Sequence, residues 1–193
     1  MKVFINPGHA PNGCPDPGAV NKYFNQKESE MVAIIANEAA EYLKQAGVDS
    51  QILQSNNLCG ESFGPCICDE ANASGADILV SIHCNAFNGE ARGCETMCYS
   101  RKTGGELAEC IQYQVWDTMK DLDPLFPDRG VKERTALAVL KYTTMPAVLL
   151  EVAFIDNAED ALLMMFHHKK IAAAIARGIT DYWYMIAHFE DEE

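Results

Sequence analysis

The feature that most constrains the fold is a run of apolar and strand-favouring residues at 78–82, followed directly by His83. A run without polar alternation is typical of a strand buried on both faces, in the middle of a parallel sheet. Because binding and catalytic groups collect where parallel strands end, His83 is a candidate functional residue. Taken alone, a core histidine hydrogen-bonded to the backbone would be the better interpretation.

Two other short apolar runs also end in candidate groups. Residues 2–6 predict a first strand, and His9 follows it after a Pro-Gly turn. Residues 147–150 predict another buried strand, which ends at Glu151. Because parallel strands end at a common edge of a sheet, these side chains are expected to gather there with His83.

The rest of the chain reads as alternating strands and helices, with no internal repeat or linker. The expected strands are 48–53, 93–99 and 136–140, and the expected helices are 28–46, 69–74, 103–120 and 156–188, with irregular chain at 54–70 and a loop at 122–130. At 193 residues the chain is long enough for one sizeable core and short for two. We therefore expect a single domain over residues 1–193.

The helix predicted at residues 28–46 carries a carboxylate on its apolar face. At 100° per residue, Met31, Ile35 and Leu43 lie on one side of this helix. Glu28 falls in the middle of the same side, at the first turn. An inward carboxylate is costly unless it is paired or binds a metal. The alternative is that its charge only stabilises the positive end of the helix dipole.

Together these residues form a recognisable donor set. Two histidines with a carboxylate, here His9, His83 and Glu28, are the ligands of a catalytic zinc that keeps one position open for water. A further carboxylate is needed to move the proton, and Glu151 suits that role. The sequence contains no H-E-x-x-H, so the common helix-borne zinc protease signature is absent.

Charge and hydropathy argue against nucleic-acid-binding and membrane-spanning classes of protein. The net charge of −13 argues against a nucleic-acid partner, which would need clustered Lys and Arg. No apolar run approaches the roughly 20 residues that span a bilayer. The apolar start at residues 3–5 is too short for a signal peptide. We therefore expect a cytoplasmic chain that is released later, or a wall protein from which a leader was removed.

The eight cysteines leave a second possibility open. Cys66 and Cys68 form C-x-C, and Cys94 and Cys98 form C-x3-C, but neither matches the paired spacing of zinc ribbons. A structural cysteine cluster is the less favoured alternative to isolated, buried thiols. A thiol-based enzyme would need Cys84 beside His83, but neighbours on a strand point to opposite faces.

Many segments of the chain resemble zinc-dependent N-acetylmuramoyl-L-alanine amidases, in the family's order and spacing. They are INPGH at 5–9, DPGA at 16–19, Glu28 with Ile35-Ala36, AN at 71–72, AD at 76–77, SIHCN at 81–85, GCET at 93–96, DRG at 128–130, LAVL at 137–140, MPAVLLE at 145–151 and FIDN at 154–157. The resemblance spans nearly the whole chain. It implies a three-layer α/β sandwich, in which about six mostly parallel strands have helices on both faces.

For the site, the resemblance implies one Zn²⁺ per chain, bound by His9, Glu28 and His83, with Glu151 as the catalytic carboxylate. The implied reaction is hydrolysis of the amide between N-acetylmuramic acid and L-alanine in peptidoglycan. A catalytically impaired peptidoglycan-binding module of the same fold is the alternative. A lone amidase domain resembles phage endolysins and the lytic amidases of sporulating cells.

Three further residues are expected to support the ligands or bind substrate: Asn6, Asn85 and Arg129. Asn6 stands where the family usually has Asp, and its amide can accept a hydrogen bond from a ligand histidine without adding charge. Ala10-Pro11 replaces the usual Gly-Gly, while Ile67 and Ala153 stand at a usual Arg and a usual Gly. These departures concern rate and substrate preference.

The length of the connection after the second histidine motif indicates whether the activity needs an activator. Some family members carry a long insertion there, which forms a helix that blocks the zinc. In this chain only the seven residues 86–92 separate SIHCN from GCET, too few for such a helix. Unless the tail beyond Tyr182 covers the site, we expect an open site and no obligatory activator.

Overall fold

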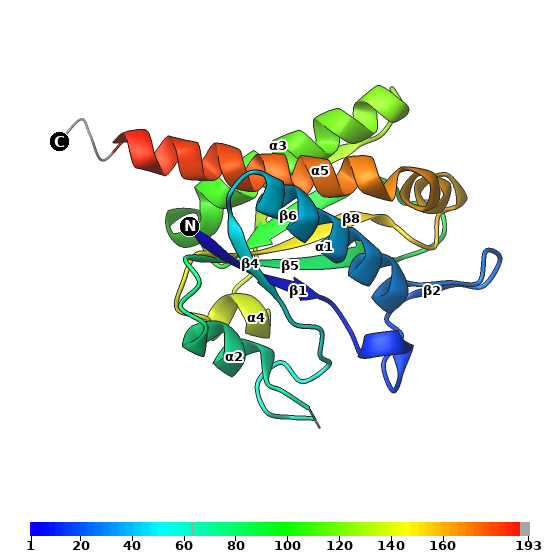
Figure 1. Cartoon of the computed structure of the whole chain (residues 1–193). Helices are drawn as coiled ribbons and strands as arrows, with labels where there is room; N and C mark the ends of the chain where they lie inside the picture. Colours follow the sequence, from blue (N-terminus) through cyan, green and yellow to red (C-terminus); the bar gives the residue numbers. More distant parts are fainter. Residues whose placement is uncertain (63, 190–193) are drawn as a thin grey trace.

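The computed structural model describes residues 1–62 and 64–189, and its centre is a six-stranded sheet in the order β4-β1-β5-β8-β6-β7 (Figure 1). The strands are β1 (Lys2–Pro7), β4 (Asp49–Ile52), β5 (Ile78–Asn85), β6 (Cys94–Cys98), β7 (Asp128–Glu133) and β8 (Ala147–Phe154). Every neighbouring pair is parallel except β6 with β8. The mostly parallel sheet with a central strand at 78–82 is therefore confirmed.

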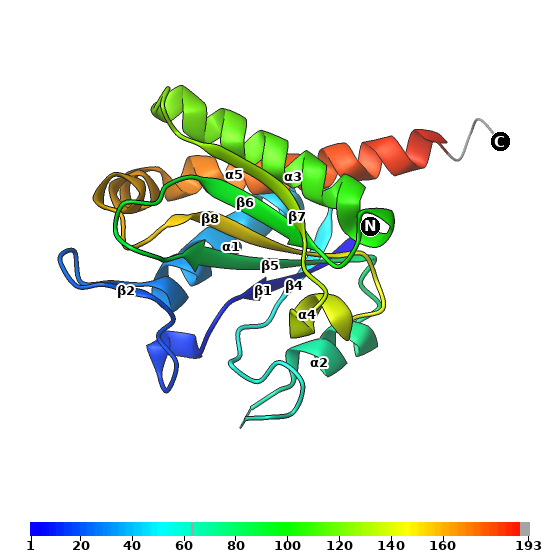
Figure 2. The same ribbon diagram turned by 180° about the vertical axis from the view of Figure 1, so that it is seen from behind.

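Helices lie on both faces of the sheet, as the three-layer prediction requires (Figures 1 and 2). The long helices α1 (Glu28–Gln45), α3 (Arg101–Leu122) and α5 (Ala158–Phe189) pack on one face, while the short helices α2 (Ile67–Ala73) and α4 (Ala138–Lys141) pack on the other. Alternation along β1 shows the division, because Val3 and Ile5 join the first cluster and Phe4 joins the second.

The face under α2 and α4 is covered only in part. The strand residues packed there include Phe4, Leu79 and Leu149, from the amino-terminal halves of β1, β5 and β8. Met97 of β6 joins them, because β6 runs antiparallel to β8. Further along the same strands, this face carries polar side chains at Ser81, His83 and Glu151. The carboxyl edge of the sheet on this side is thus left for a polar site.

The prediction of a strand at 136–140 is wrong, because residues 138–141 form the short helix α4. Leu137 precedes the helix, and Val139 and Leu140 are buried against α2 and the sheet. A run of so few apolar residues fits a buried helical turn as well as a strand, since periodicity cannot separate the two at this length.

Other boundaries also differ from the predictions. β5 and β8 do not end at His83 and Glu151: they pair at those two residues and continue for two or three more. β7 begins at Asp128, inside the expected loop, and α2 begins at Ile67. The two candidate groups therefore lie on rigid strand positions rather than in loops.

A small two-stranded sheet leads into α1. Its strands are β2 (Val20–Asn21) and β3 (Gln26–Lys27), and a short 3-10 turn, η1 (Pro11–Gly13), precedes them. At the far end of α1, Gly47 has a φ of 75°, as expected for a glycine that terminates a helix. Among the described residues, no helix is long and apolar enough to span a membrane.

Candidate metal centre

Three predicted ligands meet at the carboxyl edge of the sheet: His9 after β1, Glu28 as the first residue of α1, and His83 on β5. The Nε2 of His9 lies 3.0 Å from the Oε2 of Glu28, and the Nδ1 of His83 lies 3.0 Å from its Oε1. Their donor atoms lie within 4.8 Å of one another, which is close enough to hold one metal ion. Of the described residues, no other His, Cys, Asp or Glu group does so.

Glu28 is fixed by the backbone as well as by the histidines. Its Oε2 accepts a hydrogen bond of 2.8 Å from the backbone N–H of Ala19, and its Oε1 accepts one of 2.9 Å from Cys84. Burial would raise the pKa of Glu28, but its hydrogen bonds to His83 and His9 hold the pKa far below the usual range. The carboxylate of Glu28 thus contacts two histidines in addition to lying at a helix start. Stabilisation of the helix dipole alone would not explain these contacts.

His9 takes an unusual backbone conformation. Its φ is 67°, in the left-handed region that non-glycine residues rarely adopt, and this conformation aims its ring at Glu28. The other ring nitrogen, Nδ1, lies 2.8 Å from the Oδ2 of Asp16. Burial alone would lower the pKa of His9, but the carboxylates of Glu28 and Asp16 raise it to about 9.

Two glycines make room for the imidazole rings. A Cβ added at Gly8 would lie 2.2 Å from the Cε1 of His83. At Gly18, where φ is 67°, it would lie 2.6 Å from the Oε2 of Glu28 and 2.5 Å from the Cδ2 of His9. Neither position tolerates a side chain without displacing a candidate ligand.

Glu151 lies directly opposite His83 in the pairing of β5 with β8, so the two side chains share a face. Its Oε2 is buried and has no hydrogen-bond partner among the described residues. Burial raises the pKa of Glu151 to about 7; the neighbouring His83 opposes this increase, and the carboxylates of Glu28 and Glu95 add to it. A carboxyl group with this pKa can both accept and release a proton near neutral pH.

On the other side of Glu151 lies a charged cluster around Glu95, its partner in the pairing of β6 with β8. The carboxylate of Glu95 accepts hydrogen bonds from Asn85 Nδ2 at 3.1 Å, from Arg129 Nε at 2.9 Å and from Lys132 Nζ. The guanidinium of Arg129 also lies over the ring of Phe154, 4.9 Å from its centroid. Asn85 and Arg129 are thus brought to the site, although sequence reasoning missed Glu95.

Asn6 does not hold a ligand histidine as expected. Its Nδ2 donates to the carbonyl oxygens of Pro7 and Leu53, at 3.2 and 3.1 Å, and its Oδ1 accepts from Ser81 Oγ at 2.9 Å. Among the described residues, it is Asp16 that holds His9. Asp16 belongs to the DPGA segment, and its Oδ1 also accepts from the N–H of Gly18. The segment reads as a turn in the sequence, and only the fold shows that its carboxylate turns back to His9.

The fold and this donor set define an α/β protein with a candidate metal centre at the carboxyl edge of its sheet. Residues 3–181 match the family described as N-acetylmuramoyl-L-alanine amidase, and the chain belongs to this family of hydrolases. The predicted family and fold class are confirmed.

Individual relatives and a solved structure are similar to the chain over nearly its whole length. The chain is 34% identical to the N-acetylmuramoyl-L-alanine amidase LytC of Bacillus subtilis, over 94% of this chain and 35% of LytC. It is 32% identical to the Bacillus subtilis protein YqiI, over 94% of this chain and 84% of YqiI. The crystal structure of an N-acetylmuramoyl-L-alanine amidase from Clostridium difficile 630 superposes with a TM-score of 0.78 and 30% identity, covering 94% of this chain and 96% of that one.

Proposed function

We propose that this chain hydrolyses the amide between N-acetylmuramic acid and L-alanine in peptidoglycan, using one zinc ion bound by His9, Glu28 and His83. The observation that carries the proposal is the convergence of these three donors beside Glu151, whose Oε2 is buried and unpartnered. Family membership supports peptidoglycan as the substrate. We propose that residues 1–193 form a single catalytic domain, which is either cytoplasmic until its release or located at the wall after removal of a leader.

The donor set fits zinc. Two imidazoles and one carboxylate make three protein ligands, which is the composition of catalytic sites that keep a fourth position open. The ring of His9 is oriented by Asp16 through the nitrogen that faces away from Glu28, as ligand histidines commonly are. When bound, zinc supplies a Lewis acid that polarises the scissile carbonyl and lowers the pKa of a water molecule.

Glu151 would move the proton. Hydrolysis adds water to the lactyl carbonyl carbon and breaks the bond from that carbon to the nitrogen of L-alanine. The unpartnered Oε2 of Glu151 accepts the proton of the attacking water and passes it to this nitrogen, which leaves as an amine. The products are a lactyl carboxylate and a peptide with a free L-alanine amine.

A thiol mechanism receives no support from the geometry. The side chain of Cys84 points into the core and its Sγ donates to the Sδ of Met164 at 3.6 Å, away from His83. Burial raises the pKa of this thiol well above its usual value, and Glu28 and Glu151 raise it further. The impaired binding module would keep this same fold and site, so only turnover separates it from an enzyme.

We propose activity without an activator protein, because the connection from β5 to β6 contains no helix that could block the site. The loop between β5 and β6 is pinned by Asp156, whose Oδ2 accepts hydrogen bonds of 2.9 Å from the N–H groups of Phe87 and Gly89. α5 runs away from the β2–β3 hairpin that flanks the site, so its last described turns lie at the opposite end of the molecule (Figure 1). Residues 190–193 lie outside the described part of the chain.

Arg129 is expected to bind a carboxylate of the stem peptide. Its Nε is engaged by Glu95, while its Nη groups have no hydrogen-bond partner among the described residues. We expect Arg129→Gln to raise KM by about tenfold for a substrate that carries a carboxylate after L-alanine, with kcat changed much less. Kinetics on two muropeptides that differ only in carboxylate or amide at that position would measure this.

The matched control is Arg134→Gln, which removes an exposed arginine just beyond the opposite end of β7. This variant should keep the parent's KM for both muropeptides. If Arg129→Gln weakened both substrates equally, Arg129 would have a structural role rather than one in recognition.

A further inference from the structure

A thiol in the loop between β4 and α2 contacts a thiol in the first turn of α2. The Sγ of Cys59 lies 3.4 Å from the Sγ of Cys68, in the second residue of α2. No other pair of thiols makes such a contact in the described part of the chain. We propose that Cys59 and Cys68 are an oxidation site, which an external small-molecule disulfide converts to an intrachain disulfide bond. This inference does not depend on the proposed function.

The backbone brings these thiols together without help from the sulfur atoms. The N–H of Cys68 donates to the carbonyl of Leu58 at 3.1 Å, so the residue before Cys59 is already fixed to Cys68. The side chain of Asn57 folds the loop, because its Oδ1 accepts from the N–H of Gly60 at 2.7 Å and its Nδ2 donates to the carbonyl of Gly64 at 2.8 Å. To reach a disulfide bond of about 2.05 Å, the sulfur atoms must approach by only about 1.4 Å.

The geometry selects Cys59 rather than Cys66 as the partner. Cys66 immediately precedes α2, and its thiol donates to the carbonyl of Leu58 at 3.2 Å. Residues two apart at the start of a helix do not face each other, so the C-x-C pair itself cannot readily close. The remaining cysteines near the sheet, Cys84, Cys94 and Cys98, are buried in the larger core.

The chemistry is a two-step thiol–disulfide exchange. Cys59 is partly exposed, whereas Cys68 is buried, so the thiolate of Cys59 attacks the external disulfide first and releases one small thiol. The thiolate of Cys68 then attacks the Cys59 sulfur and releases the second small thiol. Two protein thiols are thereby oxidised to one disulfide, and one small-molecule disulfide is reduced to two thiols.

Burial raises the pKa of Cys68, and the neighbouring thiol of Cys59 raises it further. The second step should therefore accelerate as pH rises.

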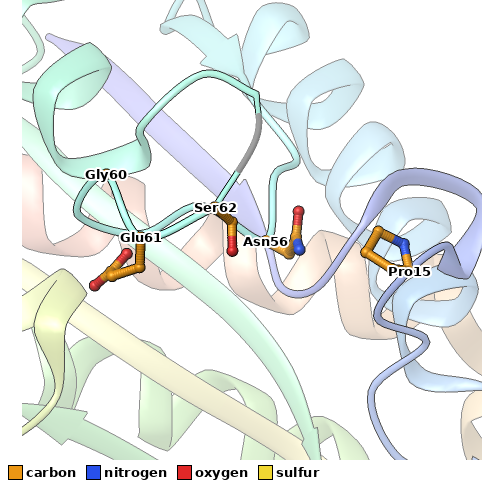
Figure 3. Close-up of a pocket in the computed structure, with 5 residues that line it drawn as sticks. All are labelled: Pro15, Asn56, Gly60, Glu61 and Ser62. Carbon is orange, nitrogen blue, oxygen red and sulfur yellow. The ribbon is translucent and has the colours of Figure 1, made fainter.

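The crosslink would fix one wall of a hollow whose opposite wall includes Pro15. Gly60, Glu61 and Ser62 follow Cys59 and line a hollow of about 600 Å³, whose other lining includes Asn56 and Pro15 (Figure 3). Pro15 precedes Asp16, the residue that contacts His9. Oxidation of the cysteine pair would thus restrain the loop that faces the His9 segment.

The test is to treat the reduced full chain with glutathione disulfide and map the products by mass spectrometry after cleavage at Glu61, which separates Cys59 from Cys68. We expect loss of two hydrogen atoms, a crosslink between the two fragments and a rise in Tm of about 5 °C. Cys66→Ser is the matched control and should oxidise like the parent, while Cys59→Ser and Cys68→Ser should not form the bond. A crosslink that requires Cys66, or a parent chain that gains only mixed disulfides, would overturn the proposal.

Discussion

Glu151→Gln is expected to lower turnover by about 10² to 10⁴-fold while the variant still folds and binds zinc. Glutamine keeps the shape of the side chain but cannot accept the proton of the attacking water or deliver it to the leaving nitrogen. Burial raises the pKa of Glu151 to about 7 in the metal-free site, and its Oε2 is free of competing partners among the described residues. The measurements are kcat on a muropeptide and zinc content by metal analysis.

Glu106→Gln is a suitable control, because it removes a carboxylate from the exposed face of α3 and should leave kcat unchanged. If Glu151→Gln retained the parent's kcat with zinc bound, another group would have to move the proton. A loss of zinc together with activity would instead mean that Glu151 supports the ligands.

Replacing His83 with alanine is expected to remove most of the bound zinc, because the site would retain two of three protein ligands. Activity should fall in proportion to the metal content. The chain should still fold, since the core on both faces of the sheet does not include this side chain. Equilibrium dialysis against zinc, with circular dichroism to monitor the fold, would test this, and stoichiometric zinc in the variant would contradict the assignment.

A substitution that keeps all three ligands should weaken zinc binding to a smaller extent. Asp16→Asn leaves all three ligands but weakens the contact that orients His9, and we expect zinc affinity to fall by about 10 to 100-fold. Asp117→Asn, on the exposed face of α3, should leave the affinity unchanged.

Because the pKa of His9 in the metal-free site is about 9, zinc must displace a proton at neutral pH. Affinity should therefore increase as pH rises toward 9 and decrease at lower pH.

The central features of the fold were predictable because they depend on local patterns. The unalternated run at 78–82 predicted a buried parallel strand, and the apolar stripe of residues 28–46 predicted a helix with Glu28 turned inward, and both are observed. The short helix α4 was not predictable in this way, because the hydrophobic pattern of four residues cannot distinguish a helix from a strand.

The site was predictable in its strand-borne groups and much less in its loops. His83 and Glu151 follow from where apolar runs end, although both strands continue past them. Asp16 and Glu95 were missed because their roles depend on contacts across the fold, to His9 in one case and to Arg129 in the other. The positive φ of His9 likewise has no signature in its sequence neighbourhood.

The most direct test of the central claim is a mass-spectrometric map of peptidoglycan digested by the purified, zinc-loaded chain without any partner protein. The proposal predicts fragments with a free L-alanine amine and glycan chains with a free lactyl carboxylate, and a zinc chelator should abolish both. Cleavage of a glycosidic bond or of a bond within the stem peptide would contradict the account, and so would intact peptidoglycan in the presence of bound zinc.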